Sequence, residues 1–233
     1  MTAVFKREFR NYFSSPLGYV VLTALFAFSG IFFAMIFASG YADISYVISS
    51  MFTIVMFAVP ILTMRLISEE FKQKTDQALL TAPVSVSGIV LGKFFAALAI
   101  FAIGFAPTLV YQIILAANTS LNWLFFFNAI LGALLYGAAL IAIGLFISSL
   151  TESQVVSAVL SVVISILITL LDSFAAMITN TFLSKLVGSL SFLGRFETFA
   201  TGILDFSNVI FFLSISAVFI FLTVRALEKK RWA

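Results

Sequence analysis

The sequence predicts an all-α protein in which one transmembrane domain, residues 1–233, crosses the bilayer six times. The chain is 62% hydrophobic and only 10% charged, whereas about a quarter of the residues in a soluble domain are charged. Its apolar residues form long runs that match the ~20 residues needed to cross a bilayer. The basic residues stand at the ends of those runs and form no patch for nucleic acid, although the net charge is +3. The expected spans are residues 17–38, 47–67, 89–117, 123–150, 155–171 and 207–224.

Residues 1–13 precede the first span and predict an amphipathic helix at the membrane interface. Phe5, Phe9 and Tyr12 share one helical face, and charged residues occupy the others. The sequence Ser-Ser-Pro at residues 14–16 ends this helix. A simple basic flank that anchors the topology is the alternative.

The first and fourth spans contain small residues four positions apart, and the second and third spans each contain a proline. This spacing lets neighbouring helices approach closely, whereas a proline inside a span predicts a bend. The small residues are Gly30, Ala34 and Ala38, then Ala133 with Gly137 and Gly144 with Ser148; the prolines are Pro60 and Pro107.

Residues 68–87 form the only long polar segment in the first two thirds of the chain. A polar segment between two spans lies in water. Ser68 is a candidate N-cap, Glu69 and Glu70 suit the positive end of a helix, and Pro83 ends it. Ser85 or Ser87 is expected to cap the next span. A helix that docks on a partner and a solvated linker both fit this pattern.

The fifth span carries a polar stripe, and a long connection follows it. Ser157, Ser161, Ser165 and Thr169 recur every four residues, so they are expected to face protein or a cavity rather than lipid. Ordinary bundle packing and the wall of a transport pathway remain open. Thr151 and Gln154 match a capping box for this span.

Residues 172–205 are more apolar than a solvated loop and predict re-entrant helices in the outer leaflet. One helical stripe comprises Leu183, Leu186, Val187 and Leu190, and a second comprises Phe192, Phe196, Phe199 and Ile203.

The distribution of basic residues predicts that both termini and residues 68–87 are cytoplasmic. In that orientation only Lys185 and Arg195 lie outside, and the other 11 of the 13 Lys and Arg residues lie inside. Basic residues favour the cytoplasmic side of a membrane.

No chemistry of its own is visible in the chain. It contains no Cys and no His, which removes thiol nucleophiles and histidine metal ligands. The segment from Gly88 to Phe94 has three residues between its glycines, and Phe follows the lysine, so it does not match a phosphate-binding loop. We therefore expect no catalytic site, no metal site and no cofactor in this chain.

Three segments in their order along the chain carry a resemblance to a known family. They are K-R-E-F-x-x-Y-F-x-S-P at residues 6–16, E-E-x-x-x-x-T-x-x-x-L-L-x-x-P-V-S at residues 69–85 and S-S-L-T-E-S-Q at residues 148–154. The chain resembles the permease subunits of ABC-2-type transporters. P-V-S-V-x-G-I-V-L-G-K-F at residues 83–94 is most similar to the gliding-motility-associated branch.

The resemblance implies a membrane subunit of an ATP-driven exporter in a prokaryotic plasma (inner) membrane. Its implied partners are a second permease subunit, in a homo- or heterodimer, and cytoplasmic ATPase subunits that hold ATP and Mg²⁺. The segment between spans two and three becomes the coupling helix, and the fifth span with its serine stripe becomes a helix near the dimer interface. Its matching residues are Glu69, Glu70, Thr75, Leu79, Leu80 and Pro83, and Phe71 belongs to its apolar face. The sequence departs from the family pattern at Lys74, where Gly is frequent, and at Gln77, where Glu is frequent.

Two other functions remain open at this stage. One is a membrane scaffold or assembly factor, and the other is a stand-alone secondary carrier, which would be expected to show internal repeats or broken midplane helices.

Overall fold

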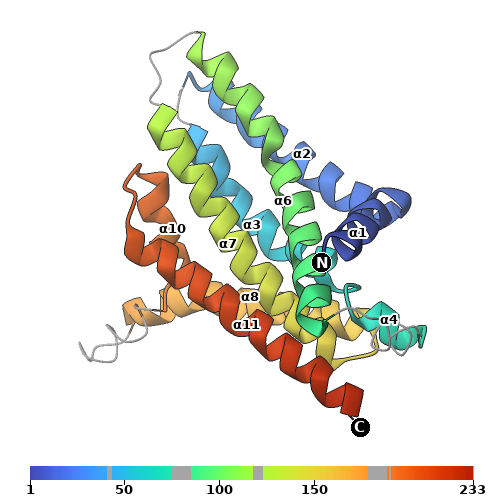
Figure 1. Ribbon diagram of the computed structural model, residues 1–233. Coiled ribbons are helices and arrows are strands. Elements are labelled where there is room, and N and C mark those ends of the chain that lie inside the picture. Colours follow the sequence, from blue (N-terminus) through green and yellow to red (C-terminus); the bar gives the residue numbers. More distant parts are fainter. Residues whose placement is uncertain (41–43, 75–84, 118–122, 178–187, 189, 233) are drawn as a thin grey trace.

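The computed structural model describes residues 1–40, 44–74, 85–117, 123–177, 188 and 190–232. All regular elements within these ranges are helices (Figure 1). The helices are α1 Thr2–Ser14, α2 Pro16–Ala38, α3 Ile44–Thr63, α4 Ser68–Lys72, α6 Val86–Ala116, α7 Trp123–Leu150, α8 Gln154–Met177, α10 Phe192–Ala200 and α11 Phe206–Trp232.

Six of the described helices are long and apolar enough to cross a membrane, which confirms the predicted fold class. They are α2, α3, α6, α7, α8 and α11. The observed helices differ from the expected ranges mainly at their ends. α3 stops at Thr63 rather than residue 67, α8 continues to Met177 rather than residue 171, and α11 continues to Trp232.

The centre of the bundle is α7. In its apolar window 78% of the residues are buried, against 17% for α8 and for α11. α7 contacts α3, α6, α8, α10 and α11. Glycine and alanine along α7 leave room for these neighbours, because small side chains allow backbones to approach closely.

Two of the predicted small-residue contacts are present within the chain, and the third is present only at its first residue. A Cβ atom on Gly137 would lie 2.1 Å from the ring of Phe101 on α6, and one on Gly144 would lie 2.2 Å from Oγ1 of Thr63 on α3. On α2, a Cβ atom on Gly30 would lie 3.5 Å from the Tyr111 hydroxyl on α6, whereas Ala34 and Ala38 are exposed. Pro60 and Pro107 lie within α3 and α6, and neither divides its helix.

α10 packs against α7, α8 and α3. Phe192, Phe196 and Phe199 of the predicted stripe are buried, whereas Ile203 is 61% exposed. The ring of Phe196 lies 4.2 Å from that of Phe52 on α3, and Phe192 packs edge-on against Phe212 of α11. In the other predicted stripe, Leu183, Leu186 and Val187 lie outside the described residues, and Leu190 is exposed.

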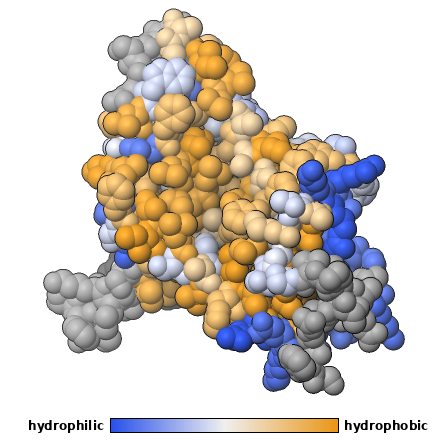
Figure 2. All heavy atoms as spheres, in the orientation of Figure 1, coloured by the Kyte–Doolittle hydropathy of each residue, from blue (hydrophilic) through white to orange (hydrophobic). Residues whose placement is uncertain are grey.

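The outer surface is apolar over the middle of the bundle, as a membrane protein requires. In Figure 2 hydrophobic residues cover most of the visible face, and hydrophilic residues gather around α1 and the carboxyl-terminal end of α11. The polar side chains described next lie at that end.

Candidate functional site

The candidate site is built around the break between α3 and α4. Residues 64–67 form turns between the two helices. A helix end leaves backbone N–H and C=O groups without partners in the helix, and near a membrane each unpaired group is costly. Side chains from three other helices satisfy these groups.

Ser148 of α7 forms hydrogen bonds with the backbone at the start of α4. Its Oγ accepts hydrogen bonds from the backbone N–H groups of Ile67 and Ser68, both at 3.1 Å, and donates to the carbonyl of Met64 at 3.2 Å. Gly144 lies one turn earlier on α7, where it lets α3 approach closely enough for these bonds. α7 therefore supplies the cap of α4.

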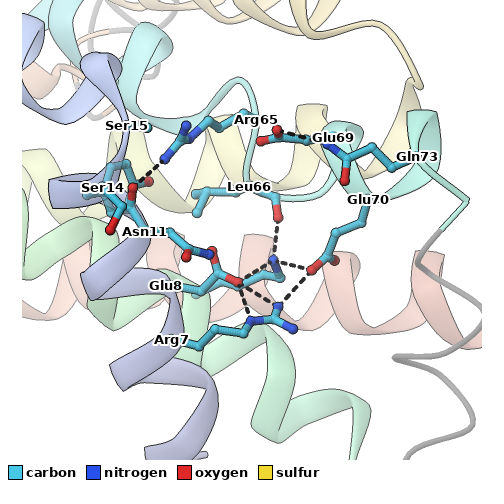
Figure 3. Close-up of a pocket in the computed structure, with 12 residues that line it drawn as sticks. Arg7, Glu8, Asn11, Ser14, Ser15, Arg65, Leu66, Glu69, Glu70 and Gln73 are labelled. Carbon is cyan, nitrogen blue, oxygen red and sulfur yellow. Dashed lines mark hydrogen bonds and ion pairs between the residues drawn. The ribbon is translucent and has the colours of Figure 1, made fainter.

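Lys93 of α6 reaches the same break from another side and is almost fully buried, with 1% of the residue exposed. Its Nζ donates to the carbonyl of Leu66 at 2.6 Å, to Oε1 of Glu70 at 2.9 Å and to Oε1 of Glu8 at 3.2 Å. Arg7 of α1 donates through Nη2 to the same two carboxylates, at 2.6 Å to Glu8 and 2.9 Å to Glu70 (Figure 3). We call Arg7, Glu8, Glu70 and Lys93 the charge cluster.

The charge cluster balances two cations against two carboxylates. Burial by itself would raise the pKa of Glu8, but the Lys93 ammonium and the bonds from Arg7 outweigh burial and hold that pKa below its ordinary value. Glu8 therefore stays ionised at neutral pH. This contribution to stability is complete above the ordinary pKa of 4.5 and is lost as the pH falls through the lower folded pKa.

α1 is fixed to the break by two further contacts. The hydroxyl of Tyr12 donates to the carbonyl of Leu62 at 2.8 Å, and Nη2 of Arg65 donates to the carbonyl of Asn11 at 3.2 Å. Arg65 also lies over the Tyr12 ring, 5.3 Å from its centroid. Burial raises the pKa of Tyr12, so its hydroxyl remains a donor.

The carboxyl-terminal end of α11 contributes the remaining contact with α4. Lys230 Nζ lies 3.5 Å from the centroid of the Phe71 ring, a cation–π geometry. Phe71 itself is only 6% exposed. α4, with five residues, is therefore connected to α1, α6, α7 and α11.

A polar cavity of about 470 Å³ opens beside the charge cluster. α1, the break and α4 line it, together with Lys93 (Figure 3). Its walls carry Arg65 and Glu69 in addition to the charge cluster, so cations and anions are mixed across it.

Comparison with protein families gives a match to the model described as ABC-2 family transporter protein, over residues 32–232. The chain belongs to the ABC-2 transporter family. It is thus a multi-pass membrane permease component of an ABC transporter and not itself the ATPase. Comparison with curated proteins finds no match.

The coupling residues expected of this ABC-2 permease fall into two groups. Glu69, Glu70 and Phe71 lie on α4, whereas Thr75, Leu79, Leu80 and Pro83 lie outside the described residues. Of the described three, Glu70 and Phe71 are engaged with their own chain. Glu69 accepts a hydrogen bond at 3.2 Å from Gln73, the residue that follows α4 in the sequence.

Of three predicted helix caps, two are wrong and one is confirmed. Ser68 does not cap α4; Ile67 holds the N-cap position, and the Ser68 hydroxyl donates back to the Met64 carbonyl. Ser153, not Thr151, caps α8 by accepting from the N–H of Val156 at 3.4 Å. Ser85 does cap α6, accepting from the N–H of Gly88 at 3.2 Å.

The helix predicted to continue beyond residue 72 instead ends there. Lys74 has a φ of +55°, in the left-handed region that ends a helix and favours glycine. Glycine is frequent at this position in the family pattern, and a left-handed backbone is the conformation that favours it. This chain has lysine in that conformation instead.

The serine stripe of α8 faces the interior of its own subunit. Ser157, Ser161 and Ser165 are at most 5% exposed, and Thr169 Oγ1 lies 3.5 Å from the sulfur of Met56 on α3. The outward face of α8 is apolar, with Val155 71% exposed and Val159 55% exposed. The stripe therefore takes part in packing α8 against α3 and α7.

Sequence reasoning missed Glu8, Tyr12, Lys93 and Ser148 as members of one site. A signal was present for Lys93, which stands inside an apolar run where a charge needs a partner. No pattern in the sequence connects it with Glu8, 85 positions away. Only the packing of α1 against α6 brings the two together.

Proposed function

We propose that this chain is the membrane-spanning subunit of an ATP-driven exporter, and that a separate cytoplasmic ATPase docks on residues 68–87. The main support for this proposal is that side-chain contacts attach α4 to four other helices. A force applied to residues 68–87 would reach α1, α6, α7 and α11 through these contacts. The resemblance to ABC-2-type permeases supports the direction of transport and the second permease subunit.

The mechanism follows from this arrangement. ATP binding and hydrolysis in the partner move the docked segment. The contacts of α4 with α1, α6, α7 and α11, which we call the α4 junction, pass the displacement to the bundle. The equilibrium between inward-open and outward-open states then shifts by the difference in binding free energy of the partner for the two states. In this proposal the chain performs no bond chemistry, and ATP and Mg²⁺ stay on the ATPase.

Glu70 and Leu79 differ in how clearly a substitution would test docking. Glu70 holds Lys93 and Arg7, so replacing it would disturb the α4 junction as well as a partner surface. Leu79 lies further along the segment and belongs to its predicted apolar face. Leu79→Asp is therefore the informative variant, with Leu190→Asp as the same substitution at an exposed leucine beyond the segment.

The test is copurification from native membranes with the tagged full chain. We expect the wild-type chain and Leu190→Asp to retain a cytoplasmic ATPase, and Leu79→Asp to lose it while its membrane abundance stays unchanged. If the wild-type chain retains no ATPase, the proposed function is wrong. Retention by Leu79→Asp at the wild-type level would show instead that residues 68–87 are a linker.

A further inference from the structure

The rotational setting of α1 is fixed by its inward contacts. Val4, Glu8 and Tyr12 share the buried face of α1. Glu8 accepts a hydrogen bond from Lys93, and Tyr12 donates one to the Leu62 carbonyl, so this face points into the bundle. The other faces of α1 therefore have defined directions. Successive residues of a helix are rotated by about 100°, because a turn takes 3.6 residues.

An aromatic row lies next to the inward face. The rings of Phe5 and Phe9 are 5.8 Å apart, those of Phe9 and Phe13 are 5.2 Å apart, and Phe13 meets Tyr19 of α2 at 6.2 Å. Tyr19 is 55% exposed on a membrane-spanning helix. The row thus continues the exposed apolar surface of α2 onto α1. Aromatic rings favour the membrane interface, so this surface suits contact with lipid there.

A pair of cations borders this row on the side away from the bundle. Lys6 and Arg10 directly follow Phe5 and Phe9 in the sequence, lie one turn apart and are both exposed. Neither forms an ion pair with another described residue, whereas Arg7, between them in sequence, is held by Glu8 and Glu70. The two side chains extend from a surface whose neighbouring stripe is apolar, which is the arrangement of a helix lying on an anionic bilayer.

We propose that Lys6 and Arg10 bind the phosphate of an anionic phospholipid in the leaflet next to α1, while the aromatic row contacts its acyl region. The occupant is a lipid because its phosphate complements the two cations and its chains complement the adjoining rings. Arg7 joins α1 to Glu70 of α4, so an occupied lipid site stabilises the junction from which residues 68–87 extend. This site needs no ATPase for its binding.

The test is a titration of the purified full chain in detergent with phosphatidylglycerol and, separately, with phosphatidylcholine. We expect phosphatidylglycerol to raise the thermal midpoint and phosphatidylcholine to have much less effect. Since each basic residue at an anionic surface contributes about 1 kcal/mol, Lys6→Gln with Arg10→Gln should weaken the apparent affinity for phosphatidylglycerol roughly 30-fold. Raising the ionic strength should reproduce part of this loss.

Two control variants separate this site from general charge. Lys72→Gln with Lys229→Gln removes two exposed cations from other helices and should leave the affinity within about threefold of wild type. Lys6→Arg with Arg10→Lys keeps both charges and should retain binding. The proposal is overturned if the α1 variant binds like wild type, if the control pair loses as much affinity, or if both lipids act equally on the wild-type chain.

Discussion

At the residue scale, Lys93 connects three parts of the α4 junction. It is buried, and its three acceptors come from α1, α4 and the break before α4. Removing one partner of a buried ion pair leaves the other charge uncompensated and typically costs about 3–5 kcal/mol. A substitution that also removes a carboxylate should cost less than the sum of the separate changes.

We predict that Lys93→Met lowers the free energy of unfolding by about 3–5 kcal/mol, and that adding Glu8→Gln recovers part of the loss. The measurement is a double-mutant cycle on thermal or denaturant unfolding of the purified chain, with a coupling energy of about 0.5–3 kcal/mol expected. Strictly additive effects would mean that Lys93 and Glu8 do not stabilise each other.

A substitution at Lys74 is expected to stabilise the protein rather than destabilise it. A non-glycine residue in the left-handed region costs about 1–3 kcal/mol, and glycine regains part of that while losing about 0.5–1 kcal/mol of chain entropy. Lys74→Gly should therefore strengthen the end of α4 and slow hydrogen exchange of its amides. Lys72→Gly, inside α4, is the control and should speed the same exchange; slower exchange in both variants would contradict the role given to the φ of Lys74.

At the scale of elements, α8 shows how a polar stripe is used. Its serines face inward and its valines face outward, so the two faces of one helix predict different tolerance to larger side chains. Inserting methylene groups into a packed contact typically costs about 1–3 kcal/mol at each site, whereas lipid adapts to the added volume.

We predict that the triple change of Ser157, Ser161 and Ser165 to Leu lowers the thermal midpoint and the membrane abundance of the chain. Val155, Val159 and Val163, each changed to Leu on the outward face of the same helix, should have little effect. The comparison is made by fluorescence-detected size exclusion after heating. Equal losses in both variants would place a second protein surface against the valines, and no loss in the serine variant would contradict the inward packing.

For the whole molecule, we predict the orientation in the membrane from the distribution of basic residues, and this prediction can be tested directly. With both termini in the cytoplasm, Gln73 lies inside and Leu190 outside; both side chains are exposed. The chain has no Cys of its own, so Gln73→Cys and Leu190→Cys each carry a unique label site. An impermeant thiol reagent should label only Leu190→Cys in intact cells and both variants after disruption; labelling of Gln73→Cys in intact cells would reverse the orientation.

The sequence alone determined the helical fold class, the six apolar helices and the membership of the ABC-2 type, because these depend on composition, run length and local motif order. It also located the cap of α6 and the close contacts at Gly137 and Gly144, since capping and small-residue spacing are local signals. The helix ends were less accurate where a distant side chain decided them. α3 stops at Thr63 because Ser148, Tyr12 and Lys93 satisfy the backbone groups that the break exposes.

Only the tertiary structure decided how α1, α4 and α6 meet. Glu69 and Glu70 are neighbours in one motif, yet Glu70 enters the charge cluster while Glu69 bonds to Gln73, just beyond α4. The rotation of each helix selects between them, and packing against the other helices sets that rotation. A charge cluster assembled from residues 7, 8, 70 and 93 is a property of that packing, because no local pattern in the sequence records the distance between those side chains.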